Sequence, residues 1–238
     1  MARTVKPDEY AAKRNEILEA ALRQMITKGF GQVVIQNVLK EINISSGAFH
    51  HYFDSRDALL EAMIKRILEE SEKPLLPIIH DPHLSAIQKL QGFFGTLDRL
   101  RIAHKADIVR IERIWYAEDN AIVRRKMDEA VIEQRAPLLT KIVCQGIQEG
   151  LFTIAYPDQA GEIILSLLQG MGNNHARLLL SVTQVSADRI GGIVDSIVTT
   201  HAAYMDAVEH VLGAPSNCLY RADSEAVMVW VTALRENS

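Results

Sequence analysis

Between residues 14 and 60 the apolar positions recur every three or four residues, and this spacing predicts a series of short amphipathic helices. The first helix covers residues 14–28 and is followed by Gly29, a residue type that commonly ends helices. The next segment has a second apolar stripe, formed by Ile35, Val38, Leu39 and Ile42. Beyond residue 60 the helical periodicity continues and no strand-like alternation persists, so the sequence predicts an all-α fold.

A sharp turn is expected at Asn43, because Asn is one of the few non-glycine residues that tolerate a left-handed backbone. Ser45 follows as a candidate N-cap of a short helix. The apolar anchors of that helix are Ile44, Phe49 and Phe53, and its small or polar positions are Ser46, Gly47, Ala48, His50 and His51. Such a helix can enter the major groove of DNA, so the segment is typical of a helix-turn-helix. Similar helix pairs occur in all-α proteins that bind no nucleic acid, and the pattern alone leaves both readings open.

The order of residues around this turn closely resembles the TetR (tetracycline-repressor) family of bacterial transcriptional regulators. The resemblance covers about residues 13–60 and rests on Ile17, Ala20, Ala21, Gly29, Phe30, the turn at 43–45, Gly47, residues 51–53 and residues 55–59. The departures from the family pattern are Val33 and Val34 in place of Thr or Ser, Asn43 in place of a turn glycine, and His50 in place of Tyr. They affect single contacts and the operator sequence rather than the fold.

The resemblance implies two domains, a DNA-binding domain at residues 1–60 and a helical effector-binding and dimerisation domain at residues 61–238. It implies a bacterial one-component transcriptional regulator, a repressor that binds a palindromic operator in double-stranded DNA as a homodimer and is released by a small-molecule effector. The positions that match the DNA-reading motif are Ser45, Ser46, Gly47, Ala48, His50, His51 and Arg56.

Each of these positions carries an expected role. Ser45 caps the recognition helix and holds a phosphate, and the three residues that follow it approach base edges. His50 reaches a base or a phosphate, whereas His51 and Arg56 bind phosphate.

The charge of the chain agrees with this division. Its 238 residues carry a net charge of −4, but residues 1–56 are net +2 and the remainder is net −6. The cations expected to face phosphate before and in the first helix are Arg3, Lys6, Lys13 and Arg14. Two cysteines are too few for a disulfide scaffold, and no apolar run is long enough for a membrane span or a signal segment, so we expect a cytoplasmic protein with no membrane partner.

The C-terminal part contains two long apolar segments, at residues 158–181 and 186–212. They offer more apolar surface than one subunit readily covers, at Ile163, Ile164, Leu167, Leu168, Met171, Ile190, Ile193, Val194, Ile197 and Val198. One interpretation is ordinary core, and the other is a pair of helices that forms a four-helix bundle with a second subunit. We favour the homodimer. A proline-containing break is expected at residues 73–82, and helices are expected at 85–101, 105–117 and 120–149.

Candidates for an effector pocket combine apolar and polar side chains in the C-terminal part. They are Phe93, Phe94, Trp115, Tyr116, Met127, Met171, Asn174 and His175. Core packing is the alternative for each of them. The amides and the imidazole of residues 173–175 are the most suggestive, since buried polar groups need partners.

The remaining groups of polar or reactive residues are not interpreted as metal, redox or catalytic sites. The histidines of the segment 80–83 are interpreted as exposed rather than as zinc ligands, and Cys144 as a core residue rather than a redox sensor. No catalytic grouping and no cofactor motif is visible, so we expect neither an enzyme nor a cofactor. A tail helix at 224–234 either docks on the body, covers a pocket or extends an interface. The main alternative function is a helical ligand-binding or scaffolding protein whose helix-turn-helix no longer binds DNA; an enzyme using the C-terminal cavity is the other.

Overall fold

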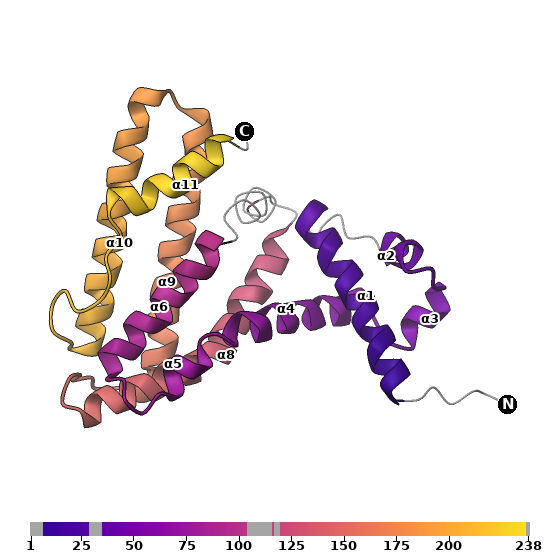
Figure 1. The fold of residues 1–238 in the computed structure, drawn as a ribbon, viewed down its shortest axis with the longest axis horizontal. Coiled ribbons are helices and arrows are strands. Elements are labelled where there is room, and N and C mark those ends of the chain that lie inside the picture. Colours follow the sequence, from indigo (N-terminus) through magenta and orange to yellow (C-terminus); the bar gives the residue numbers. More distant parts are fainter. Residues whose placement is uncertain (1–6, 29–34, 104–115, 117–119, 237–238) are drawn as a thin grey trace. The chain divides into compact units, whose positions relative to one another are not determined.

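A computed structural model describes residues 7–28, 35–103, 116 and 120–236 of the chain. Every regular element in these ranges is a helix, which confirms the all-α prediction (Figure 1). The α-helices are α1 (Pro7–Lys28), α2 (Ile35–Glu41), α3 (Ser46–His50), α4 (Arg56–Glu72), α5 (Leu76–His80), α6 (Ala86–Ala103), α8 (Ala121–Gln148), α9 (Pro157–Ser181), α10 (Ile190–Leu212) and α11 (Ser224–Glu236). Short 3₁₀ turns, η3 (Val182–Gln184) and η4 (Ala187–Arg189), connect α9 to α10.

The chain forms two compact units. The first contains the described residues of 1–70 and 113–127, and the second contains those of 71–112 and 128–238. Helices α4 and α8 contribute to both units, because each continues across the division. The division by function at residue 60 stays a prediction, since compactness does not assign function.

The first unit is built around α1. This helix begins at Pro7, earlier than the apolar periodicity indicates, because proline suits the first helical position and Asp8 and Glu9 favour a helix N-terminus. The buried side chains of the unit come from all four N-terminal helices and include Ile17, Ala20, Ala21, Val38, Leu39, Phe49, Leu59, Leu60 and Met63. Residues 29–34, which include Val33 and Val34, lie outside the described ranges.

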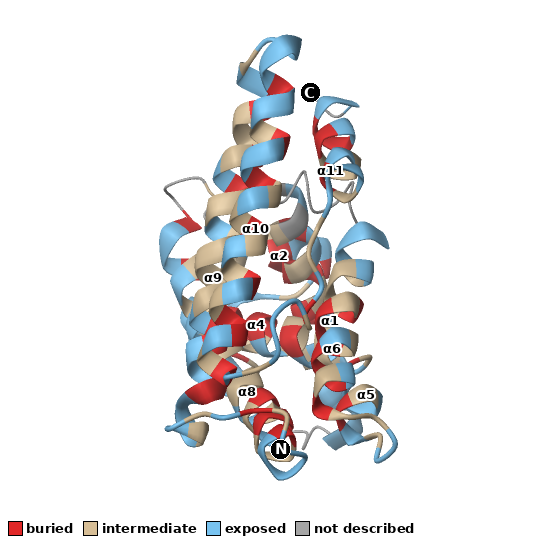
Figure 2. Ribbon diagram, turned by 90° about the vertical axis from the view of Figure 1, so that its left-hand side faces the viewer, coloured by how far each residue is buried: buried red, intermediate tan, exposed pale blue. Residues whose placement is uncertain are grey.

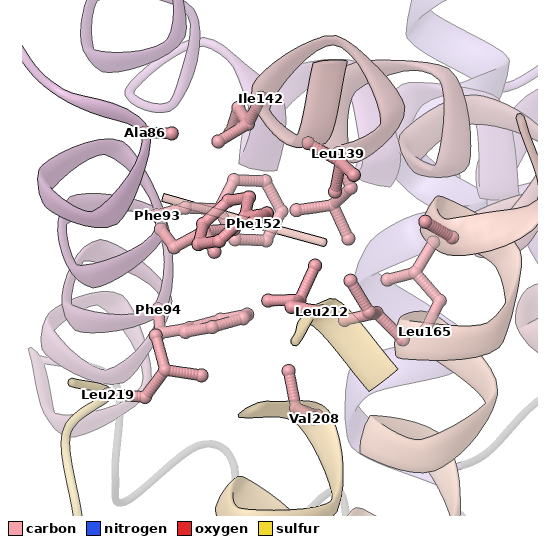
Figure 3. Packing of buried hydrophobic residues seen from close by; sticks show 14 of the residues in the cluster. Ala86, Phe93, Phe94, Leu139, Ile142, Phe152, Leu165, Val208, Leu212 and Leu219 are labelled. Carbon is pink, nitrogen blue, oxygen red and sulfur yellow. The ribbon is translucent and has the colours of Figure 1, made fainter. Parts of the chain in front are cut away.

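The main core of the second unit lies between α6, α8, α9 and α10 (Figure 3). Phe93, Leu139 and Leu212 are fully buried in it, and Phe152 enters from the loop after α8. Full burial of one such side chain contributes about 1.5–3 kcal/mol. Gly161 lets α8 and α9 approach closely, because a Cβ atom at this position would lie only 2.1 Å from the carbonyl oxygen of Ala136.

A second cluster is formed where α11 covers part of α10. Val227, Val231 and Leu234 of α11 pack with Ile190, Val194 and Ile197 of α10. Figure 2 shows the resulting alternation of buried and exposed positions along both helices. The tail helix therefore docks on its own unit. These three α10 residues belong to the apolar surface that the sequence analysis considers for dimerisation, and they are covered within the chain.

Two segments of the second part of the chain differ from the sequence prediction or lie outside the described residues. The segment at 73–82 is not simply a break, since it contains α5, which accommodates Pro77 in its first turn. The helix expected at 105–117 falls almost entirely outside the described residues, so it stays a prediction. None of the described helices is long and apolar enough to cross a membrane.

Candidate functional site

A tight turn joins α2 to α3, as the sequence predicts. Asn43 has a φ of 53°, in the left-handed region. The N–H of Ile44 donates to the carbonyl oxygen of Leu39 at 3.0 Å, which satisfies one of the last carbonyl groups of α2. Asn43 therefore adopts the left-handed conformation that favours glycine.

Ser45 caps α3, which confirms the predicted capping role. Its backbone is extended, with φ −79° and ψ 158°, and its hydroxyl oxygen accepts a hydrogen bond from the N–H of Ala48 at 3.1 Å. Such a cap contributes about 1 kcal/mol to helix stability. It fixes the start of a helix that spans only the residues Ser46–His50.

Two phenylalanines hold α3 in the first unit. Phe49 is fully buried, Phe53 is nearly so, and their ring centroids lie 5.8 Å apart. The guanidinium of Arg14 lies 4.6 Å from the centroid of the Phe53 ring, at a distance typical of a cation–π contact. The opposite side of the segment is open, since Ser46, Gly47, His50 and His51 are exposed and Ala48 is half-buried.

The N-terminal turns of α1 support the end of α3, a contact that apolar periodicity does not predict. The hydroxyl of Tyr10 donates to the carbonyl oxygen of His51 at 3.0 Å, and the rings of Tyr10 and Tyr52 lie 4.9 Å apart. The proline followed by two acids at residues 7–9 was the available signal that α1 reaches this far. These contacts fix the backbone that carries His51.

Polar contacts also hold α2 against α1. Arg23 donates to Glu41 at 2.7 Å, and the side-chain amide of Gln24 donates to the same carboxylate at 3.1 Å. Because Gln24 is buried, water screens its hydrogen bond to Glu41 less than it screens the one from Arg23. The helix-turn-helix is therefore tied to α1 through its first helix as well as through α3.

The predicted phosphate-facing cations have different surroundings. Arg3 and Lys6 lie outside the described residues. Lys13 forms an ion pair with Glu16 at 2.8 Å, and Arg14 contacts Phe53. Arg56 is exposed at the first position of α4, next to Ser55, whose hydroxyl caps that helix by accepting from the N–H of Ala58 at 3.0 Å.

The predicted effector-pocket residues are distributed over both units. Tyr116 and Met127 belong to the first unit, and Trp115 lies outside the described residues. The other five belong to the second unit and are Phe93, Phe94, Met171, Asn174 and His175. The two phenylalanines are core residues with ring centroids 5.6 Å apart, and Met171 packs against the same core.

The polar members of this set have distinct environments. The side-chain carbonyl of Asn174 accepts a hydrogen bond from Arg177 at 2.8 Å. Burial lowers the pKa of His175 to about 4, and the nearby His201 and Arg101 act in the same direction. His175 is therefore uncharged at neutral pH and lies against α10, a neighbour that the sequence alone did not reveal.

A shallow groove lies on the surface of α9 and α10. It has a volume of about 530 Å³ and is lined by Gln159, Glu162, Ile163, Ser166, Leu167, Gly170 and Tyr204. Ile163 is 41% exposed, and its neighbour Leu167 in the groove is half-buried. Elsewhere in the described ranges, no group of three His, Cys, Asp or Glu side chains is placed to bind a metal ion.

Two family models match the chain. Residues 17–63 match the model described as bacterial regulatory proteins, tetR family, and residues 108–174 match the model described as tetracyclin repressor-like, C-terminal domain.

Curated relatives match part of the chain. The HTH-type transcriptional regulator YuxN of Bacillus subtilis is 36% identical over 66 residues, which are 28% of this chain and 23% of that protein. The HTH-type transcriptional regulator BetI of Escherichia coli is 27% identical over 96 residues, 40% of this chain and 49% of that protein. The HTH-type transcriptional repressor KstR2 of Mycobacterium tuberculosis is 24% identical over 151 residues, 59% of this chain and 70% of that protein. The matched region thus spans less than half the length of the first two relatives.

Solved structures share the fold over most of the chain. The crystal structure of RolR in complex with resorcinol has a TM-score of 0.58 at 18% identity and covers 94% of this chain and 96% of that one. A TetR transcription regulator from Haloarcula marismortui has a TM-score of 0.52 at 21% identity, with coverage of 83% and 98%. At these identities the likeness concerns the fold alone.

Proposed function

Because the chain belongs to the TetR family of bacterial regulatory proteins, we propose that it is a transcriptional repressor that binds a palindromic operator as a homodimer and is released by a small-molecule effector. The observation that carries the proposal is the construction of α3. Its capped start and buried phenylalanines hold it rigidly, and its small and polar residues are exposed. A recognition helix needs these two properties together.

The DNA contacts are assigned by position on this segment. Ser46 and Gly47 approach base edges, and the methyl group of Ala48 suits a thymine methyl. His50 contacts a base or a phosphate. His51 and Arg56 contact phosphate, and the N-terminus of α3 behind Ser45 adds a further phosphate contact.

Dimerisation is assigned to the outer face of α9 and α10. The groove there presents Ile163, Leu167 and Tyr204, apolar and aromatic side chains that a second subunit can cover, and Gly170 accommodates the Tyr204 hydroxyl of the same chain. The proposed dimer interface is smaller than the apolar surface that the sequence predicts for it. Ile190, Val194 and Ile197 are left out, because they pack in one cluster with residues of α11. A dimer places two recognition helices about one helical turn of DNA apart, which suits a palindrome.

Effector release is assigned to the second unit, which carries the polar residues Asn174 and His175 on a long helix. The fold is compatible with this role, since RolR, which shares it, has been solved with a small ligand. A hundredfold loss of DNA affinity requires a coupling of about 2.7 kcal/mol between the two sites, within the usual range for allosteric proteins.

Selection of protein-bound fragments from random and genomic DNA, at two salt concentrations, tests the proposal. We expect enrichment of a palindrome, weaker binding at the higher salt concentration, and sedimentation as a dimer. A folded dimer that enriches no sequence would instead support a ligand-binding or scaffolding protein. A stable monomer at micromolar concentration would contradict the assigned interface.

A further inference from the structure

Two histidines from neighbouring helices lie together in the second unit. The ring centroids of His175 on α9 and His201 on α10 are 5.9 Å apart, and the ring planes are within 13° of parallel. The ring of Tyr220, in the segment before α11, lies 5.8 Å from His201 in an edge-on arrangement. None of the three residues falls within the ranges that the family models match.

Both rings are uncharged at neutral pH. Burial lowers the pKa of His175 to about 4 and also lowers the pKa of His201, and in the second case Arg221 adds to the effect. An uncharged imidazole has one N–H donor and one nitrogen acceptor. The cluster can therefore both donate and accept hydrogen bonds.

The surrounding contacts assign the tautomers. Nδ1 of His201 accepts a hydrogen bond from the N–H of Ala222 at 3.2 Å, so its proton resides on Nε2. Nε2 of His175 is buried and has no hydrogen-bond partner among the described residues. The hydrogen bond between His175 and the backbone of Ile197 is therefore made by Nδ1. Nε2 then carries no proton and is available as an acceptor. Buried polar atoms nearly always have partners, so this acceptor calls for one.

Tyr220 links the histidine cluster to the apolar core, because it directly follows the core residue Leu219. Phe94 and Leu219 are buried core residues, and Asp98 and Tyr220 follow them on α6 and on the segment before α11. Figure 3 shows Phe94 and Leu219 among the residues of this core. Burial raises the pKa of Asp98 and also that of Tyr220, and the charges of Asp223 and then Asp98 add to the rise for Tyr220. Small-molecule sites typically combine such an apolar wall with a few polar groups.

We propose that the histidine cluster recognises a neutral hydroxyl group of the effector, with the hydroxyl hydrogen donated to Nε2 of His175 and the hydroxyl oxygen accepting from Nε2–H of His201. The assignment rests on the proposed effector-responsive function. A hydroxyl fits because it carries a donor and an acceptor on one atom, as the two rings require. An ether oxygen only accepts, so it leaves the nitrogen of His175 unpaired.

Matched pairs of an alcohol and its methyl ether test the assignment on the full chain without DNA. Phenol is compared with anisole, and cyclohexanol with methoxycyclohexane, by calorimetric titration and by the shift in melting temperature. We expect both alcohols to bind the wild-type protein and both ethers to bind about tenfold more weakly or not at all, since one hydrogen bond to a buried group is lost. Equal binding of alcohol and ether, or binding of neither alcohol, would overturn the proposal.

A substitution at the acceptor gives the second test. His175→Phe keeps a ring of similar size and removes the acceptor, and His83→Phe is the control at an exposed histidine of the same unit. We expect phenol to bind His175→Phe about tenfold more weakly, whereas His83→Phe retains the wild-type affinity. Unchanged phenol binding by a folded His175→Phe variant would overturn the assignment. Whether the alcohol also lowers the affinity for DNA is measured separately. That measurement tests the proposed regulatory function and does not change the conclusion on hydroxyl recognition.

Discussion

Arg221 donates two hydrogen bonds to the carboxylate of Glu209, one to each oxygen, at 3.0 and 2.8 Å, although Glu209 is only 2% exposed. The same carboxylate accepts from the backbone N–H groups of Leu219 and Asn217 at 2.8 and 2.9 Å. Burial raises the pKa of Glu209, but the hydrogen bonds from Arg221, Leu219 and Asn217 outweigh it and bring the pKa down to about 2. Glu209 thus holds the segment that leads from α10 to α11.

We expect Glu209→Gln to lower the free energy of unfolding by about 3–5 kcal/mol, because the partly buried Arg221 loses its closest charged partner and, at the buried position of Glu209, an amide N–H₂ faces other donors. Urea unfolding measures the change. The matched control is Asp206→Asn, since Asp206 is exposed and lies 4.0 Å from the same guanidinium; it should cost less than about 1 kcal/mol. Equal effects of the two substitutions would contradict the role given to Glu209.

The histidine cluster predicts a fall in stability at acid pH. The folded-state pKa of His175 is about 4, below its ordinary value of 6.5, so the unfolded chain binds the proton more tightly between these values. Stability is therefore complete above pH 6.5 and declines as the pH falls toward 4. Urea unfolding as a function of pH should show a shallower decline for His175→Phe than for His83→Phe. The same slope in both variants would show that His175 does not titrate as stated.

Two glycines of α9 should respond oppositely to alanine. At Gly161 a Cβ atom would meet the backbone oxygen of Ala136, which cannot move aside, and we expect Gly161→Ala to destabilise the protein by about 1–3 kcal/mol or more. Gly172 has no atom within 4 Å of the same position, and Gly172→Ala should stabilise it by up to about 1 kcal/mol through helix propensity. Thermal unfolding compares them. A Gly161→Ala variant with the stability of the wild type would mean that α8 and α9 are not so closely packed.

Residues that contact phosphate and residues that contact bases should be distinguished by how their substitution changes the salt dependence and the sequence preference of DNA binding. Arg56→Ala is expected to weaken binding to all duplexes and to reduce the salt slope by about one, because one phosphate contact is lost. Ser46→Ala should change the preferred sequence and leave the salt slope unaltered. Fluorescence anisotropy with the selected duplex and a scrambled one checks both. Equal effects of the two variants on both duplexes would refute this division of roles.

The sequence was sufficient for the local features of the helix-turn-helix. Asn43 and Ser45 have conformational preferences that hold in nearly any context, and both occupy the predicted positions. The spacing of Phe49 and Phe53 likewise identified the buried side of the segment. The start of α1 at Pro7 was missed because its first turns carry few apolar residues, although its capping signals were present.

Contacts between distant segments were harder to predict. Apolar periodicity identified α10 and α11 as amphipathic but could not show that Val194 and Ile197 face α11 rather than a second subunit. Nor could it show that His175 meets His201, since that depends on how α9 and α10 pack. Helix periodicity tells which residues share a face, and only the packing shows what covers that face.

The affinity of a Gly47→Ala variant for the selected palindrome tests the central claim most directly. A Cβ atom at Gly47 would lie 3.9 Å from the hydroxyl oxygen of Ser45 and meet nothing closer, so the variant should fold with a melting temperature equal to or above that of the wild type. If the exposed face of α3 lies against DNA, the added methyl group should reduce affinity for the palindrome by at least about tenfold, which corresponds to 1.4 kcal/mol. Unchanged affinity in the folded variant would contradict the claim that α3 is the recognition helix.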